Sequence, residues 1–167
     1  MRSKGKILCD MCGIFGYVGT RTASPILIDG LRTLEYRGYD SAGIFVPGHG
    51  VEKAVGPIDN LVKSMPDTVR GTVGIAHTRW ATHGVPSVEN AHPHKDMSGN
   101  VWLVHNGIIE NFRELKEGLV VQGIEFESDT DTEVLVKLIG SLNRGNLSVA
   151  VRSALGMIRG TYGIAVI

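Results

Sequence analysis

Met11-Cys12-Gly13-Ile14-Phe15-Gly16 is the stretch from which the rest of the chain can be understood. The sulfur of Cys12 gains a base within its own residue if Cys12 becomes the first residue of the mature chain. A free α-amine has an ordinary pKa of about 7.7–8.0, which suits a base near neutral pH. We therefore expect residues 1–11 to be a leader or a misassigned start that is removed. The domain would then span residues 12–167.

The composition predicts one folded domain without a charged macromolecular partner. The chain has 167 residues, of which 43% are hydrophobic, so it can bury a core. Lys and Arg number 17 and Asp and Glu number 17, and this balance gives no support for a nucleic-acid groove or an anionic membrane surface. No apolar run approaches the ~20 residues of a membrane-spanning helix. We expect a cytoplasmic protein with no nucleic-acid and no membrane partner.

Apolar periodicity and turn signals predict an α+β fold, with strands in neighbouring pairs and helices grouped between them. Strands are expected at residues 13–19, 44–46, 52–55, 72–77, 101–105 and 163–167 and around Phe126. Helices are expected at residues 24–34, 58–64, 111–122, 130–142 and 148–157, with Ser24, Asn111 and Thr130 as N-caps. The last strand ends without a turn, so we expect the chain to be a fragment.

Three polar segments have both a functional and a structural explanation. Arg79 follows a strand and offers a planar fork of donors for a carboxylate, although it could equally pair with a local acid. Asn106 and Gly107 could supply the two donors of an oxyanion hole, but an ordinary Asn-Gly turn is the simpler interpretation. The acids at 129–133 suit a helix start, and one of them could instead hold a ligand ammonium.

A metal or redox site is a weaker alternative. Cys9 and Cys12 form a single CxxC pair without the second pair of a zinc site. A thioredoxin-like motif would be followed by a helix, whereas a glycine-rich strand is expected here. The spacings of the histidines fit no helix-based ligand pattern, so we expect no metal and interpret these side chains as structural or substrate-contacting.

Five blocks together resemble one family. Cys12 to Gly16, Leu34 to Gly43, His77 to Gly84, His105 to Asn111 and Asp129 to Val134 are similar, in family order, to the glutaminase domain of glutamine–fructose-6-phosphate aminotransferase. The related glutamine phosphoribosylpyrophosphate amidotransferases share the N-terminal Cys and the Asn-Gly pair. They are not expected to carry the 36–41 and 80–84 runs in this form.

The resemblance implies an N-terminal-nucleophile hydrolase fold, a four-layer αββα sandwich, here truncated at its C-terminus. It implies that Cys12 is the nucleophile and that Asn106 and Gly107 form the oxyanion hole. Arg79, Thr82 and His83 would hold the α-carboxylate of L-glutamine, and Asp131 its α-ammonium. Trp80 would gate ammonia passage, and Arg37 would support the surroundings of the nucleophile.

The resemblance also implies what lies outside the chain. The sugar-isomerase domains that receive ammonia are absent, and the full-length form is expected to be a homodimer that needs no cofactor at this site. Two alternatives stay open. The chain could be a catalytically silent glutamine-binding fragment with Cys12 blocked by residues 1–11. It could also be the glutaminase domain of a phosphoribosylpyrophosphate-type amidotransferase.

Overall fold

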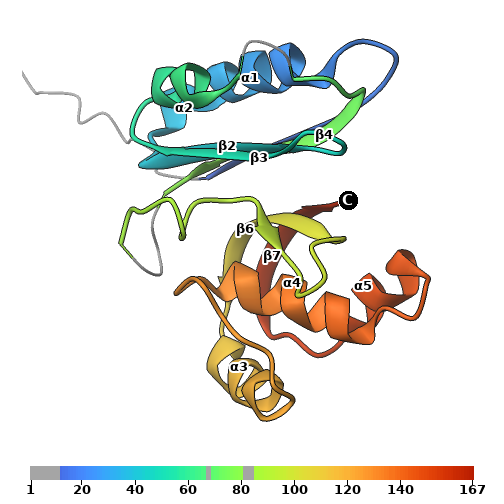
Figure 1. Cartoon of the computed structure of the whole chain (residues 1–167). Helices are drawn as coiled ribbons and strands as arrows, with labels where there is room; N and C mark the ends of the chain where they lie inside the picture. Colours follow the sequence, from blue (N-terminus) through green and yellow to red (C-terminus); the bar gives the residue numbers. More distant parts are fainter. Residues whose placement is uncertain (1–11, 67–68, 81–84) are drawn as a thin grey trace, which may run out of the picture.

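The computed structural model describes residues 12–66, 69–80 and 85–167, and it has four layers (Figure 1). A four-stranded and a three-stranded antiparallel sheet face each other in the middle. Helices cover the outer face of each sheet. The expected αββα sandwich is therefore confirmed.

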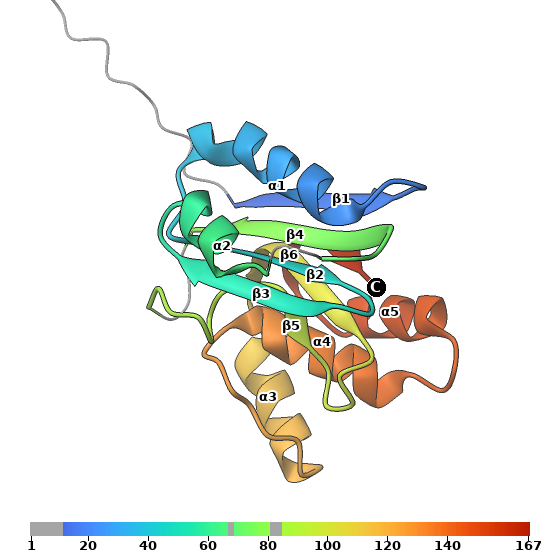
Figure 2. The ribbon, with the colours of Figure 1, turned by 45° about the horizontal axis from the view of Figure 1, so that its top comes forward.

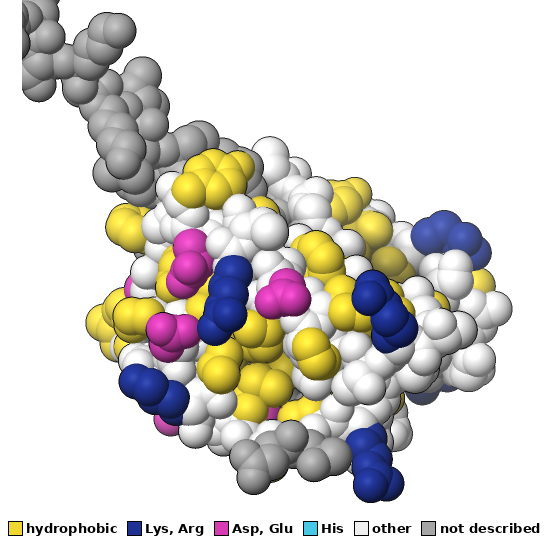
Figure 3. Space-filling view, turned by 90° about the horizontal axis from the view of Figure 1, so that it is seen from above, with side chains coloured by type: hydrophobic (Ala, Val, Ile, Leu, Met, Phe, Trp, Pro, Cys, Tyr) yellow, Lys and Arg dark blue, Asp and Glu magenta, His cyan; other side chains and the backbone are white. Residues whose placement is uncertain are grey.

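The upper half is built on the sheet with strand order β1-β4-β2-β3, seen nearly edge-on in Figure 1 and more openly in Figure 2. Its elements are β1 (Gly13–Val18), α1 (Ala23–Leu34), a 3-10 turn (Glu35–Arg37), β2 (Ser41–Val46), β3 (Gly50–Val55), α2 (Ile58–Ser64) and β4 (Val73–Arg79). Leu27, Leu31 and Ile44 belong to the fully buried core between α1, α2 and the sheet. Figure 3 looks onto the outer side of these helices, where apolar and charged side chains are mixed.

The lower half is built on the sheet with strand order β5-β6-β7. Its elements are β5 (His94–Lys95), β6 (Trp102–Ile109), α3 (Phe112–Val121), α4 (Asp131–Leu142), α5 (Leu147–Leu155) and β7 (Gly160–Val166). A second apolar core, which includes Leu103, Leu135 and Ile139, lies between this sheet and the helices. Within the part of the chain that the structure describes, no helix is long and apolar enough to cross a bilayer.

The two cores leave the space between the sheets to a different set of side chains. Along β4, Ala76 belongs to the core under α1, so the alternating residues Ile75, His77 and Arg79 face the other sheet. Phe45 of β2 stacks on Trp102 of β6 with ring centroids 4.3 Å apart. Apolar contacts thus hold the sheets together at one place, and polar side chains occupy another.

The largest correction concerns Asn106-Gly107, which was expected to end a strand in a turn. Strand β6 instead runs through both residues to Ile109 and pairs with β7, with Gly107 opposite Tyr162. The partner strand lies more than fifty residues later in the sequence, so local turn propensity could not reveal it. Gly107 has a φ of 133°, and a Cβ there would lie 2.0 Å from the carbonyl oxygen of Thr161.

Three smaller expectations, two about helix caps and one about a strand, were also wrong. Helix α1 begins at Ala23, and the Ser24 hydroxyl donates to the carbonyl of Val69 instead of capping the helix. Asn111 precedes α3 but makes no side-chain cap, because its amide bonds the backbone of Met157 and Arg159. Phe126 is not in a strand; its ring lies beneath the ammonium groups of two lysines.

Candidate active site

The pairing of β1 with β4 places Cys12. Gly13 lies opposite Thr78 in this register, and its N–H donates to the Thr78 hydroxyl at 3.1 Å. Cys12 stands one residue before β1, so it lies beside the end of β4. There the N–H of Trp80 donates to the Cys12 sulfur at 3.1 Å. Sheet register therefore brings together a thiol and a strand end that are 68 residues apart in the sequence.

The surroundings of Cys12 favour the neutral thiol. Burial raises the pKa of the thiol above its ordinary value, and the negative charge of Asp40 adds to this. The Trp80 N–H and the positive charge of Arg79 act in the opposite direction without cancelling the effect of burial. At neutral pH the resting sulfur is therefore protonated, and a nucleophilic attack requires a base that takes its proton.

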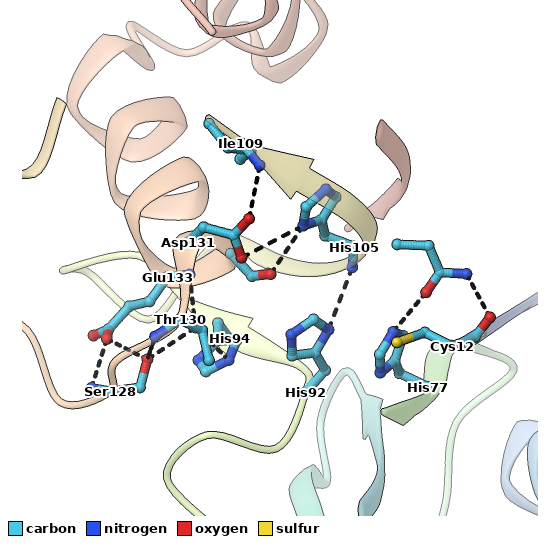
Figure 4. A network of polar contacts seen from close by, with 12 residues as sticks. Cys12, His77, His92, His94, His105, Ile109, Ser128, Thr130, Asp131 and Glu133 are labelled. Carbon is cyan, nitrogen blue, oxygen red and sulfur yellow. Dashed lines mark hydrogen bonds and ion pairs between the residues drawn. The ribbon is translucent and has the colours of Figure 1, made fainter. Parts of the chain in front are cut away.

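Asn106 reaches Cys12 from the facing sheet. Its Nδ2 donates to the carbonyl oxygen of Cys12 at 3.0 Å, and its Oδ1 lies 2.8 Å from Nε2 of His77 (Figure 4). Since Asn106 comes from β6 and His77 from β4, this side chain bridges the two sheets. Gly107 is the next residue of β6, so both residues expected to form an oxyanion hole lie on the strand that contacts Cys12.

Arg79 ends β4 with its side chain almost fully buried. A guanidinium nitrogen lies 3.8 Å from a carboxylate oxygen of Asp40, and the Asp40 N–H donates to the Arg79 carbonyl at 2.8 Å. Burial lowers the pKa of Arg79, while Asp40, Cys12 and Asp131 favour its charged form. Arg79 is therefore not in the surface loop of the simpler interpretation but buried on a strand, where it pairs with an acid distant in the sequence and places a cation near the thiol.

Asp131 is the first residue of α4 and is buried between that helix and β6. Its Oδ2 accepts from the N–H of Ile109 at 2.8 Å, and its Oδ1 lies 4.0 Å from Nδ1 of His105. The helix begins with Thr130 as N-cap, whose hydroxyl accepts from the N–H of Glu133. The expected capping role thus belongs to Thr130, and the carboxylate of Asp131 is turned toward β6 (Figure 4).

The other expected site residues are placed less completely. Trp80 follows β4 and leaves 40% of its surface exposed next to Cys12. Arg37 ends the 3-10 turn, but its side chain lies outside the described part of the structure, as do Thr82 and His83. Among the expected site residues, the structure therefore places Asn106 and Arg79 next to Cys12, with Gly107 following Asn106 on the same strand.

The alternative of a metal or redox site gains no support from this geometry. Cys9 lies outside the described residues, and Cys12 is followed by β1 where a thioredoxin-like motif would have a helix. Within residues 12–66, 69–80 and 85–167, no group of three or more His, Cys, Asp or Glu is arranged to hold a metal ion.

A comparison with known protein families then assigns the chain. Residues 65–165 match the model of the glutamine amidotransferase domain, which is more than half of the sequence. The chain belongs to the glutamine amidotransferase domain family. The match to this family model thus confirms the family that the sequence motifs resemble.

Two sequence relatives of this amidotransferase domain carry the same name. It is 53% identical over 171 residues to a glutamine–fructose-6-phosphate aminotransferase (isomerizing) of Methanosarcina mazei, an alignment that covers 94% of this chain and 28% of that protein. It is 52% identical to a Thermus thermophilus protein of the same name, over 93% of this chain and 26% of the relative. The chain therefore spans about a quarter of the length of these relatives.

Solved structures support the fold of the amidotransferase domain. The glutamine phosphoribosylpyrophosphate amidotransferase of B. subtilis superposes with a TM-score of 0.80 at 31% identity, over 92% of this chain and 34% of that one. A structure described as the allosteric regulatory enzyme of purine biosynthesis gives a TM-score of 0.77 at 32% identity, over 94% and 35%.

Two residues of the amidotransferase site had received no individual role from sequence reasoning. His77 bonds Asn106, and Asp40 pairs with Arg79. The sequence did contain one indication for His77, because a polar residue in a strand that is expected to be buried needs a polar partner. Asp40 belongs to the Leu34 to Gly43 block, but its place beside Arg79 depends on β2 pairing with β4, where Ser41 lies opposite Arg79.

Proposed function

We propose that this domain hydrolyses the side-chain amide of L-glutamine and, in the full-length enzyme, supplies the ammonia for glucosamine 6-phosphate synthesis from fructose 6-phosphate. The observation that carries the proposal is the hydrogen bond from the Asn106 amide, on the facing sheet, to the backbone carbonyl of Cys12, the residue that carries the thiol. A nucleophile at the start of one strand and an oxyanion donor on another suit acyl transfer from an amide.

In the proposed reaction, the free α-amine of Cys12 takes the thiol proton as the sulfur attacks the amide carbon of glutamine. The negative oxygen that develops is held by Nδ2 of Asn106 and the N–H of Gly107. When the C–N bond breaks, the α-ammonium returns its proton to the leaving nitrogen and ammonia departs. Water then attacks the γ-glutamyl thioester, and glutamate leaves with the thiol restored. These steps use no cofactor.

We assign substrate recognition to charges at the two ends of the amino acid. Arg79 would bind the α-carboxylate with help from Thr82 and His83, and Asp131 would bind the α-ammonium. The burial of both charges supports this assignment, because a substrate ion pair is bound more strongly where water is excluded. Trp80 beside the thiol would gate ammonia passage, and Arg37 would support the surroundings of Cys12.

The proposal requires residues 1–11 to be removed. As long as Cys12 is acylated by Met11 it has no α-amine, and the burial of its thiol leaves the sulfur protonated. We therefore propose that Met11 is the initiator and is cleaved off, because the following residue is small. The cytoplasmic location, the homodimer and the sugar-isomerase partner domains stay predictions about the whole protein.

Two forms of the protein test the proposed function: the chain from Met1 and a chain whose gene begins at Met11. Intact mass should show that the second form starts at Cys12, and only this form should release ammonia and glutamate from glutamine. Cys12→Ala should abolish release while glutamine binding stays measurable by calorimetry. A chain that demonstrably begins at Cys12 and releases no ammonia would refute the proposal in favour of a silent glutamine-binding fragment.

The structural similarity to phosphoribosylpyrophosphate amidotransferase supports a second candidate for the molecule that receives the ammonia. Identities of 52–53% to the aminotransferases, against 31–32% to the two solved structures, favour the sugar acceptor. Both alternatives share the chemistry at Cys12 and differ only in the domain that uses the ammonia. The DNA that follows the codon of Ile167 distinguishes them if it encodes either a sugar-isomerase or a phosphoribosyltransferase region.

A further inference from the structure

His77 lies between the two sheets. It projects from β4, is fully buried, and places Nε2 2.8 Å from Oδ1 of Asn106. At its other end the same amide donates from Nδ2 to the carbonyl oxygen of Cys12. Figure 4 shows this chain of contacts running from the imidazole to the nucleophile's backbone.

The chemistry of these three groups permits one arrangement of protons. The carbonyl oxygen of Cys12 can only accept, so the amide must turn its NH₂ group toward it. The amide oxygen then faces His77, which must donate from Nε2. Burial lowers the pKa of His77 to about 3, so the ring keeps a single proton over the ordinary pH range. That proton stays on Nε2, because Asn106 offers it an acceptor there.

The imidazole of His77 is itself held in place by neighbouring rings. His92 stacks on it with centroids 4.1 Å apart, and His94 meets His92 edge-on at 4.9 Å. We call these three residues the histidine row. Its far end is fixed where Nε2 of His94 lies 3.1 Å from the hydroxyl of Thr130, the N-cap of α4. The ring that faces Asn106 is therefore anchored to both halves of the domain.

We propose that His77 is a positioning residue that holds the amide of Asn106 with its NH₂ group aimed at the oxyanion formed on glutamine. The inference rests on the proposed function. The last torsion of an Asn side chain is broad and roughly two-fold, so an amide held at one end only can turn away or reverse. An oxyanion donor contributes only when it is aimed before the reaction begins. The hydrogen bond from His77 supplies the second point of attachment.

Two substitutions in the chain that begins at Cys12 separate positioning from packing. His77→Gln keeps an N–H donor near the place of Nε2, whereas His77→Met fills a similar volume with no donor. We expect His77→Met to lower kcat for glutamine hydrolysis about 10–100-fold with KM changed less than about twofold, since losing one oxyanion donor costs about 10²–10³ in kcat. His77→Gln should recover most of this loss.

A second reaction of the same thiol serves as the internal control. Iodoacetamide alkylates Cys12 without forming an oxyanion, so its rate constant should be the same in all three proteins. If His77→Met does not fold, His77→Asn provides the comparison, because its shorter amide cannot reach Asn106.

Two results would overturn the inference while leaving the proposed function intact. One is a kcat for His77→Met equal to that of the unsubstituted chain. The other is a fall in kcat that is accompanied by an equal fall in the rate of alkylation by iodoacetamide, which would indicate general damage to the site. Failure of the unsubstituted chain to hydrolyse glutamine would instead refute the proposed function itself.

Discussion

Replacing Gly107 by alanine is expected to destabilise the domain strongly, although the change adds only one methyl group. The φ of 133° at this position lies in a region that L-residues rarely adopt, which costs about 1–3 kcal/mol. The added Cβ would also lie 2.0 Å from the carbonyl oxygen and 2.7 Å from the carbonyl carbon of Thr161. This contact is with the backbone of β7, so no side chain can rotate to relieve it.

Overpacking of this kind costs about 1–3 kcal/mol when the backbone must shift. Together the two effects predict that Gly107→Ala lowers the free energy of unfolding by roughly 2–6 kcal/mol. Equilibrium unfolding in urea measures this difference. Hydrogen exchange gives the local result, and it should show the loss of protection concentrated in β6 and β7, where Gly107 lies opposite Tyr162.

Gly118 provides the matched control. It lies in α3 with nothing within 4 Å of a Cβ built on it, and its φ is not positive. Gly118→Ala should therefore stabilise the helix by about 0.5–1 kcal/mol. A free energy of unfolding for Gly107→Ala within about 0.5 kcal/mol of the wild type, a margin typical of substitutions that touch nothing, would refute this prediction.

Three further predictions follow from buried charges. Asp40→Asn should lower the pKa of the Cys12 thiol, because the carboxylate disfavours the thiolate. The pH profile of alkylation by iodoacetamide should then shift toward lower pH, and an unshifted profile would contradict this prediction. The histidine row should make the domain sensitive to acid. The folded-state pKa values of its members lie far below the ordinary 6.5, at about 3 for His77, so the unfolded chain takes up protons first. The free energy of unfolding should fall progressively from pH 6.5 toward pH 3, by roughly 1 kcal/mol per histidine between pH 7 and 5.5. An unchanged urea midpoint between pH 7 and 5.5 would count against this prediction. Glu133→Gln should cost about 2–4 kcal/mol in urea unfolding, because it leaves the buried ammonium of Lys137 without its carboxylate. Glu114→Gln, which breaks an exposed pair, is the control and should leave the midpoint unchanged.

The buried carboxylate of Glu133 is stabilised at the start of α4 by an ion pair and by hydrogen bonds. Burial opposes its ionisation, but Lys137 and the backbone N–H groups of Glu127 and Ser128 hold its pKa below the ordinary value. Its Oε2 accepts from both the N–H and the hydroxyl of Ser128 at 2.7 Å. The loop before the helix is therefore fixed, and this fixes where Asp131 begins the helix beside β6.

Sequence patterns were most accurate where structure depends on near neighbours. The helix at residues 58–64 has its expected bounds, because amphipathic periodicity acts within a few residues. The hairpin between β2 and β3 is where it was expected, although its strands begin earlier, at Ser41 and Gly50. Thr130 caps α4 as the capping box predicted. The same local reasoning failed at Asn111, whose amide is taken up by a segment almost fifty residues away.

The sequence by itself determined which family the chain belongs to, and it drew attention to Cys12, Arg79, Asn106 and Asp131. Residue types carry chemistry wherever they lie, so a thiol, a planar cation and an amide could be recognised before their positions were known. Only the tertiary structure decided that Asn106-Gly107 is strand and not turn, and that His77 and Asp40 border the site. These facts depend on β6 pairing with β7 and on β4 pairing with β1 and β2, which are contacts between distant segments that no local pattern encodes.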